Sequence, residues 1–184
     1  MSIWDRYAQF IYKIATGDKR RRKLITALAP FAFYGITALV ILASYFVDKW
    51  LGLPFFGFSL SWWRIGLSTF LVALGCAIAG STYVTFFRTR GTPVPFSPPP
   101  KLITSGLYAY TRNPMFIGGF FVLEGFGVLL GLLSLIFIFA PLLMLFYAFY
   151  VKAVEEKELE MKFGQEYLDY KKRVPMFIPW LKKK

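Results

Sequence analysis

The residues of this sequence that could do chemistry form three sets. The first is an aromatic, basic and amide cluster just before an apolar run: Tyr108, Tyr110, Arg112, Asn113 and Met115. The second is the acidic pair Glu155 and Glu156, which follows the next apolar run. The third is Glu124, about three turns inside the first of these runs, where an ionisable side chain is a functional hypothesis by default. Together they offer a guanidinium for pairing and carboxylates that can accept a proton.

Each set also has an ordinary structural explanation. Tyr and Arg are common at a membrane interface. Glu155 and Glu156 begin an acidic run that is compatible with a solvated helix face, stabilised by pairs such as Glu158–Lys162 at i,i+4 spacing. Glu124 is compatible with a place near the outer interface or a bond to a neighbouring helix. The residue types alone therefore leave the function open.

Composition excludes several kinds of chemistry. The chain has no His, so Ser–His and Cys–His catalysis and His-ligated zinc are excluded. Its one cysteine, Cys76, lies inside an apolar run, which excludes a disulfide framework and a thiolate cluster. We therefore expect no metal site.

The distribution of charge indicates a membrane protein. Only 17% of the 184 residues are charged and 57% are hydrophobic, whereas soluble domains carry about 25% charged residues. The net charge of +12 comes from basic residues grouped before the first apolar run, between the second and third, and after the fourth. Basic residues on alternate loops follow the positive-inside rule and favour contact with anionic lipids over binding to nucleic acid.

Four apolar segments can position these residues, since about 20 apolar residues cross a bilayer. We predict an all-α membrane protein: an interfacial amphipathic helix and basic block over 1–23, then one transmembrane domain over 24–184. Its predicted spans are 24–47, 62–87, 114–130 and 135–156, with a C-terminal extension over 157–184. Both termini are then on the cytoplasmic side, in the inner membrane if the source is bacterial.

Finer features refine this scheme. Residues 48–61 are predicted to form a loop, and Arg64 to extend outward to the interface. Small residues in the second span, Gly75 and Ala79 among them, favour close helix packing. The proline-rich segment 89–100 predicts an extended strap. Pro114 should begin the third span, and Gly164 should end a fourth helix that continues to Phe163.

Two linked motifs resemble one known family. The first motif, GLYAYTRNPMFIGG, places Gly106, Tyr108, Arg112, Asn113 and Pro114 in the pattern G-x-Y-x-x-x-R-[HN]-P. The second, EEKELEMKFGQEYLDYKKRVPMFIP, begins at Glu155 and contains Gly164, Tyr167, Tyr170, Pro175 and Pro179. With an apolar hairpin between them, these motifs resemble the isoprenylcysteine carboxyl methyltransferase and phospholipid methyltransferase superfamily. The resemblance covers about the last 85 residues.

This resemblance implies an enzyme that binds S-adenosylmethionine at the cytoplasmic ends of its last two spans. It would methylate a lipophilic small molecule or a lipid-modified substrate, such as a phospholipid amine or a prenylated carboxylate. The implied cofactor-binding residues are Tyr108, Arg112, Asn113, Pro114, Met115, Glu155 and Glu156. The implied catalytic residues are Arg112, Glu155 and Glu124, with either Glu as acceptor of an amine proton.

Two departures from the family pattern bear on the substrate. Asn113 stands where many members have His, so that position cannot titrate. Val151 stands where the carboxyl methyltransferases have Arg, with Lys152 one residue away, which argues against a prenylated carboxylate. Two alternatives are an NADPH-dependent sterol-type membrane reductase and a non-enzymatic anchor that binds anionic lipids.

Overall fold

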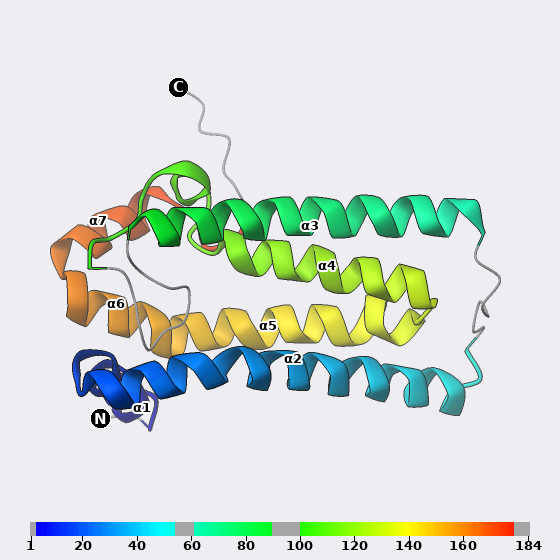
Figure 1. Ribbon diagram of the computed structural model, residues 1–184, viewed down its shortest axis with the longest axis horizontal. Helices are drawn as coiled ribbons and strands as arrows, with labels where there is room; N and C mark the ends of the chain where they lie inside the picture. The colour runs from blue at the N-terminus through cyan, green and yellow to red at the C-terminus, as the bar shows by residue number, and fades with distance from the viewer. Residues whose placement is uncertain (1–2, 54–60, 90–99, 179–184) are drawn as a thin grey trace. The chain divides into compact units, whose positions relative to one another are not determined.

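The computed structural model describes residues 3–53, 61–89 and 100–178. All regular elements in these ranges are helical (Figure 1). The longer helices are α1 (Ile3–Thr16), α2 (Lys19–Trp50), α3 (Trp62–Arg88), α4 (Pro114–Leu130), α5 (Ala140–Tyr150), α6 (Glu156–Phe163) and α7 (Gln165–Arg173). Shorter turns are the 3₁₀ helix η1 (Gly106–Ala109) and two π-helical turns, η2 (Leu135–Phe139) and η3 (Val151–Glu155). Most of the proline-rich strap predicted over 89–100 lies outside the described residues, as does Pro179.

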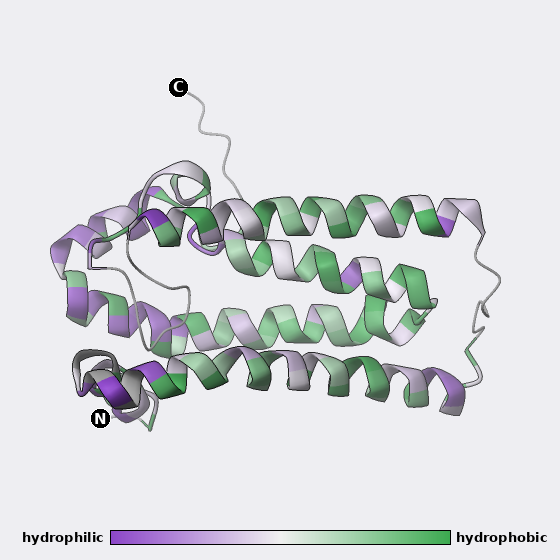
Figure 2. Cartoon of the chain, viewed as in Figure 1, coloured by the Kyte–Doolittle hydropathy of each residue, from purple (hydrophilic) through white to green (hydrophobic). Residues whose placement is uncertain are grey.

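Within the described residues, three helical stretches are long and apolar enough to cross a membrane: Lys23–Trp50, Trp62–Arg88 and Leu135–Phe163. The apolar helix Pro114–Leu130 is shorter, at 17 residues, so the predicted count of four spans stays a prediction. Figure 2 shows apolar residues along α3, α4 and α5 and hydrophilic residues concentrated in α6 and α7. The chain is thus an integral membrane protein with a polar segment after its last apolar helix.

The described chain forms two compact units. One contains Met1–Pro30, Gly80–Met115 and Tyr147–Lys184; we call it the polar unit. The other contains Phe31–Ala79 and Phe116–Phe146; we call it the apolar unit.

Close helix packing dominates the apolar unit. A β-carbon on Gly75 of α3 would lie 2.5 Å from the carbonyl oxygen of Gly118 in α4, and one on Gly118 would lie 2.8 Å from the Ala79 nitrogen. Real β-carbons do not approach backbone that closely, so only glycine permits this approach of α3 to α4. The predicted packing role of Gly75 and Ala79 is confirmed.

Two charged residues of the apolar unit differ from the sequence prediction. Arg64 does not extend to the interface: it is 3% exposed and donates hydrogen bonds to the carbonyl oxygens of Val128 (3.2 Å) and Leu129 (2.8 Å). These carbonyls belong to the last turn of α4, which lacks intrahelical donors, and a cation there is favourable.

Asp48 does not begin a loop, because α2 continues to Trp50. Its buried carboxylate accepts a hydrogen bond from the backbone N–H of Ser134 at 2.9 Å, and the Ser134 hydroxyl donates to the carbonyl of Ser44 at 2.9 Å. Asp48 thereby satisfies a backbone donor at the start of the helix that contains η2. One oxygen of the buried carboxylate is thereby satisfied, whereas Oδ2 is buried without a hydrogen-bond partner among the described residues.

The polar unit has two small cores. In one, Ala8 and Ile11 of α1 pack on Val154 of η3. In the other, Tyr167, Tyr170 and Val174 pack together with Leu102, Leu159 and Phe163 around them. Gly164 separates α6 from α7 with a φ of +55°, a conformation that favours glycine, and so the predicted helix end after Phe163 is confirmed.

Candidate functional site

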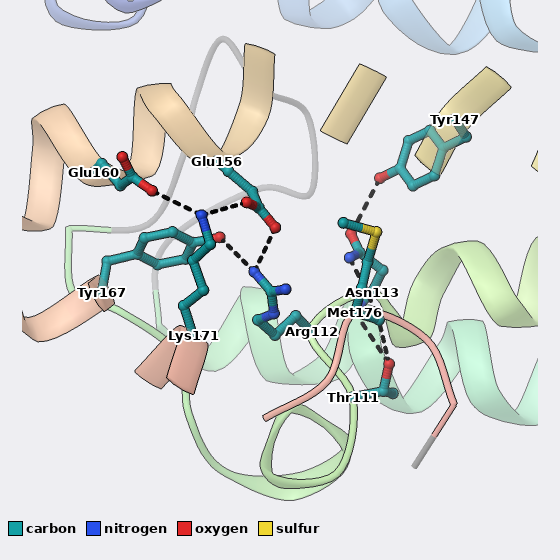
Figure 3. A network of polar contacts seen from close by, with 9 residues as sticks. All are labelled: Thr111, Arg112, Asn113, Tyr147, Glu156, Glu160, Tyr167, Lys171 and Met176. Carbon is teal, nitrogen blue, oxygen red and sulfur yellow. Dashed lines mark hydrogen bonds and ion pairs between the residues drawn. The ribbon is translucent and has the colours of Figure 1, made fainter. Parts of the chain in front are cut away.

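The centre of the polar unit is an ion pair between the two sequence motifs. Nη1 of Arg112 lies 2.6 Å from Oε1 of Glu156, and the same nitrogen donates to the Tyr167 hydroxyl at 3.1 Å (Figure 3). Both charged side chains are nearly buried, with 10% and 5% of their surfaces exposed. Burial lowers the pKa of Arg112, but Tyr167 and Glu156 outweigh this effect and raise it, so the guanidinium stays charged.

Lys171 extends this network from α7. Its ammonium lies 2.5 Å from Oε2 of Glu156 and 2.9 Å from Oε1 of Glu160, so the Glu156 carboxylate is shared between two cations (Figure 3). Burial lowers the pKa of Lys171, yet its hydrogen bonds to the two carboxylates raise it overall above 10.5. A buried carboxylate with a cation on each oxygen is held in one orientation.

A backbone clasp joins the segment before α4 to the end of the described chain. Arg112 donates its backbone N–H to the carbonyl of Pro175 at 2.9 Å. The Met176 carbonyl accepts from the Thr111 hydroxyl at 2.9 Å and from the Asn113 side-chain amide at 3.2 Å. Asn113 is therefore a structural donor here, a role that needs no titration. The two motifs meet within the polar unit, as the sequence predicted.

The π-helical turn η3 places Glu155 on the same helix face as Tyr147, eight residues earlier. Two α-helical turns contain about 7.2 residues, and a π-helical turn adds about one, so residues eight apart lie near one face. The Tyr147 hydroxyl accordingly lies 3.3 Å from Oε2 of Glu155 and 3.4 Å from Oδ1 of Asn113. Glu155 faces Tyr147, whereas Glu156 faces Arg112.

Tyrosines surround this polar centre as neutral groups. Burial, together with the charges of Glu155 and Tyr170, raises the pKa of Tyr108 well above its ordinary value. Burial also raises the pKa of Tyr167 to about 12. The Tyr170 hydroxyl donates to the Tyr108 carbonyl at 2.7 Å, and the Tyr108 ring meets Phe86 edge-on at 5.9 Å. These rings place aromatic surface next to the carboxylates.

The other predicted site residues are distributed as follows. Pro114 is fully buried as the first residue of α4, and Met115 is half-buried beside it. Tyr110 is 61% exposed. Glu124 is half-buried in α4 and belongs to the apolar unit. The solvated-face explanation of the acidic run is wrong for Glu156 and Glu158, which are each 4% exposed.

The sequence matches the phospholipid methyltransferase family over residues 56–166. This stretch is more than half of the chain and contains Arg112, Asn113, Tyr147, Glu155 and Glu156. The protein belongs to the phospholipid methyltransferase family.

Individual relatives match different shares of this chain. A protein-S-isoprenylcysteine O-methyltransferase from Mus musculus is 39% identical over 88 residues, which cover 44% of this chain and 28% of the mouse protein. A methanethiol S-methyltransferase from Crocosphaera subtropica is 29% identical over 128 residues, 69% of this chain and 46% of that protein. Protein-S-isoprenylcysteine O-methyltransferase B from Arabidopsis thaliana is 26% identical over 182 residues, 97% and 89% of the two chains. The match to the mouse protein thus spans less than a third of that relative's length.

In this member of the phospholipid methyltransferase family, sequence reasoning missed three contributors to the network. Tyr167 was part of a motif without an assigned role, and Lys171 and Tyr147 were not singled out. Their signals in the sequence are weak, because a lysine in a basic stretch and a tyrosine in an apolar run are common. The family resemblance left two partners open for Arg112, a carboxylate of the acidic pair or that of the cofactor, and in the structure Arg112 pairs with Glu156.

Proposed function

We propose that this protein is an integral-membrane methyltransferase that uses S-adenosylmethionine and acts on the polar end of a lipophilic acceptor. The observation that carries the proposal is the buried Arg112–Glu156 pair with Glu155 beside it, built from residues that the family match includes. Membership of this family favours neither the reductase nor the lipid-anchor alternative.

The side chains of the polar unit fit such a cofactor. Its amino-acid end combines an ammonium and a carboxylate, which are matched by the Glu155 and Glu156 carboxylates and the Arg112 guanidinium. Within the described part of the chain, Nε of Arg112 is buried and has no hydrogen-bond partner, so it offers a donor for an anionic group. Tyr108 offers an aromatic face for a cationic sulfonium or an adenine ring. Asn113, Pro114 and Met115 complete the proposed binding set.

S-adenosylmethionine supplies a methyl group already activated on a sulfonium. The protein's task is then to align the acceptor and to exclude water. A buried, desolvated network performs the second task, and the fixed orientation of Arg112 and Glu156 serves the first. This division of labour is consistent with a chain that has no His.

The proposed acceptor carries an amine or another neutral nucleophile. Val151 is 2% exposed and Lys152 is exposed, so the turn that would supply a cation for an acceptor carboxylate presents a buried apolar side chain instead. An amine acceptor must lose a proton, and we propose Glu155 as the group that takes it, with Glu124 as the alternative. The names of the relatives refer to isoprenylcysteine and methanethiol. They support an acceptor whose polar group belongs to a small molecule or is attached to a lipid.

Calorimetric titration of the detergent-purified protein with S-adenosylhomocysteine tests the cofactor. Replacing both carboxylates, in the double variant Glu155→Gln/Glu156→Gln, removes two charge-assisted hydrogen bonds and leaves Arg112 without its buried partner. Each such bond contributes about 1.5–3 kcal/mol, so we expect micromolar binding by the wild type and a loss of at least about 100-fold in the variant.

Glu166→Gln is the control, because Glu166 is an exposed carboxylate on α7 and the same type of replacement there removes one negative charge away from the network. It should bind like the wild type. If the wild type does not bind S-adenosylhomocysteine, the cofactor assignment is wrong. Equal binding by wild type and double variant would show that the two carboxylates are not part of the cofactor site.

A further inference from the structure

Helix α1 is separate from both motifs, yet it packs directly on the turn that orients Glu155 and Glu156. Ala8 and Ile11 are 1% and 2% exposed and pack on Val154, which is fully buried in η3. Asp5 of α1 forms an ion pair with Lys157, two residues after η3. The Trp4 ring meets Phe149 edge-on at 5.1 Å. One face of α1 thus contacts the helical segment both before and after the Glu155–Glu156 pair.

A second face of α1 is apolar and uncovered. Ile3, Tyr7 and Phe10 lie at i, i+4 and i+7, on one side of the helix, and are 68%, 44% and 52% exposed. Arg6 and Lys13, also exposed and seven residues apart, border this face. Helical spacing of about 100° per residue puts the exposed Gln9 on the remaining, polar side.

The bilayer interface is the partner that this second face fits. With 14 residues, α1 is about 21 Å long, too short to cross a hydrocarbon core of about 30 Å. Only Gly17 and Asp18 separate it from α2, whose apolar stretch begins at Lys23. Large apolar side chains bordered by basic ones, directly before a membrane-spanning stretch, are typical of a helix that lies among anionic headgroups.

We propose that α1 binds the anionic headgroup layer through Ile3, Tyr7 and Phe10, and that this attachment holds η3 in the geometry that directs Glu155 and Glu156. Contact with lipid on one face and with Val154 on the other holds α1 in a single position. The lipid surface then stabilises the acidic pair through Ile11 and the Asp5–Lys157 ion pair. The link to catalysis rests on the proposed function; the attachment and the stabilisation of η3 do not.

The lipid contact is tested by spin labels on the full chain in nanodiscs, after Cys76→Ser removes the native thiol. A nitroxide placed by Phe10→Cys should be relaxed mainly by oxygen, which concentrates in lipid. One placed by Gln9→Cys, the control on the neighbouring polar face, should be relaxed mainly by a water-soluble nickel complex. Equal access of the nickel complex to both labels would overturn the lipid contact and indicate a face covered by protein or open to water.

Hydrogen exchange of the 151–163 backbone, measured by mass spectrometry, tests the coupling. Replacing neutral lipid by phosphatidylglycerol should slow this exchange several-fold in the wild type. Tyr7→Ser/Phe10→Ser, on the lipid-facing side, should abolish that lipid dependence, and Ile11→Ala, on the packed side, should speed exchange in both lipids. Unchanged exchange in both variants would overturn the coupling.

S-adenosylhomocysteine titration of the same samples separates the two proposals. Lipid-dependent exchange without any binding of this ligand would support the coupling and refute the cofactor assignment. Binding that coexists with lipid-independent exchange would support the cofactor assignment and refute the coupling.

Discussion

Glu156 is the residue on which the polar network depends, because each of its carboxylate oxygens meets a different cation. Arg112 approaches Oε1 at 2.6 Å and Lys171 approaches Oε2 at 2.5 Å. Removing one partner of a buried ion pair is strongly destabilising, since the other charge stays buried without compensation. The two cations are not equivalent, because the side chain of Lys171 is 35% exposed whereas that of Arg112 is 10% exposed. Solvent can replace Lys171 more readily than Arg112.

Lys171 should therefore make a pH-dependent contribution to stability. Its pKa is raised in the folded protein, so this contribution is fully present below the unfolded pKa of about 10.5 and is lost as the pH rises through the higher folded pKa. We expect Lys171→Met to lower the thermal unfolding midpoint in detergent at pH 8. The difference between variant and wild type should shrink as the pH rises through this raised folded pKa.

Lys172→Met is the control for this measurement, because Lys172 is on the same helix and 72% exposed. Its effect should be small at pH 8. A difference between Lys171→Met and wild type that stayed constant from pH 8 to 12 would contradict the assigned role of the ammonium.

At the scale of elements, neighbouring glycines in α4 have opposite surroundings. A β-carbon on Gly118 would lie 2.7 Å from the Gly75 carbonyl oxygen, whereas one on Gly119 would have no atom within 4 Å. Forcing extra volume into a tight contact costs about 1–3 kcal/mol. We expect Gly118→Ala to lower the unfolding midpoint in detergent and Gly119→Ala to leave it unchanged or raise it slightly. If Gly118→Ala is as stable as Gly119→Ala, α3 and α4 do not pack as closely as described.

Element boundaries were mostly predictable, because apolar runs and helix-stopping residues are local signals. The third apolar helix has the predicted bounds, 114–130, and Gly164 ends α6 as expected. The sequence predicts that Asp48 begins a loop, but in the structure Asp48 is buried and accepts a hydrogen bond from the Ser134 N–H, 86 residues away. Arg64 was misplaced for the same reason, since its partners are carbonyls of α4. Contacts at that separation leave no local signal.

The candidate site was predictable where residues belong to motifs and unpredictable where geometry decides. Arg112, Asn113, Glu155 and Glu156 were found as motif residues, and their meeting was expected. The π-helical turn η3 inserts one residue into a helix and has no proline or glycine of its own to mark it, so the contact of Glu155 with Tyr147, eight residues earlier, could not be derived. Lys171 reaches Glu156 only because the chain turns at Gly164 and continues as α7.

At the scale of the whole molecule, the number of spans decides on which sides the two ends of the chain lie. Three helical stretches in the described part of the chain are long enough to cross, and Pro114–Leu130 would be a fourth. With four spans Gln9 and Gln165 are on the same side of the membrane, and with three they are on opposite sides. Basic residues around both ends favour the same, cytoplasmic side.

Labelling of single cysteines in sealed vesicles tests this prediction. In a Cys76→Ser background, Gln9→Cys and Gln165→Cys should both be protected from a membrane-impermeant maleimide in right-side-out vesicles. Both should react in inverted ones. Reaction of only one of the two in a given orientation would show that Pro114–Leu130 does not cross.

The clasp between Thr111–Asn113 and the carbonyls of Pro175 and Met176 has a consequence for biosynthesis. The ribosome makes Pro175 and Met176 after the described helices that are long and apolar enough to cross the membrane, so these helices can insert before the clasp closes. Until then Arg112 and Asn113 lack these backbone partners. The nascent chain is then inserted in the membrane, but its polar network is not yet fully assembled. A chain cut short after α6 would be released into the membrane in that state.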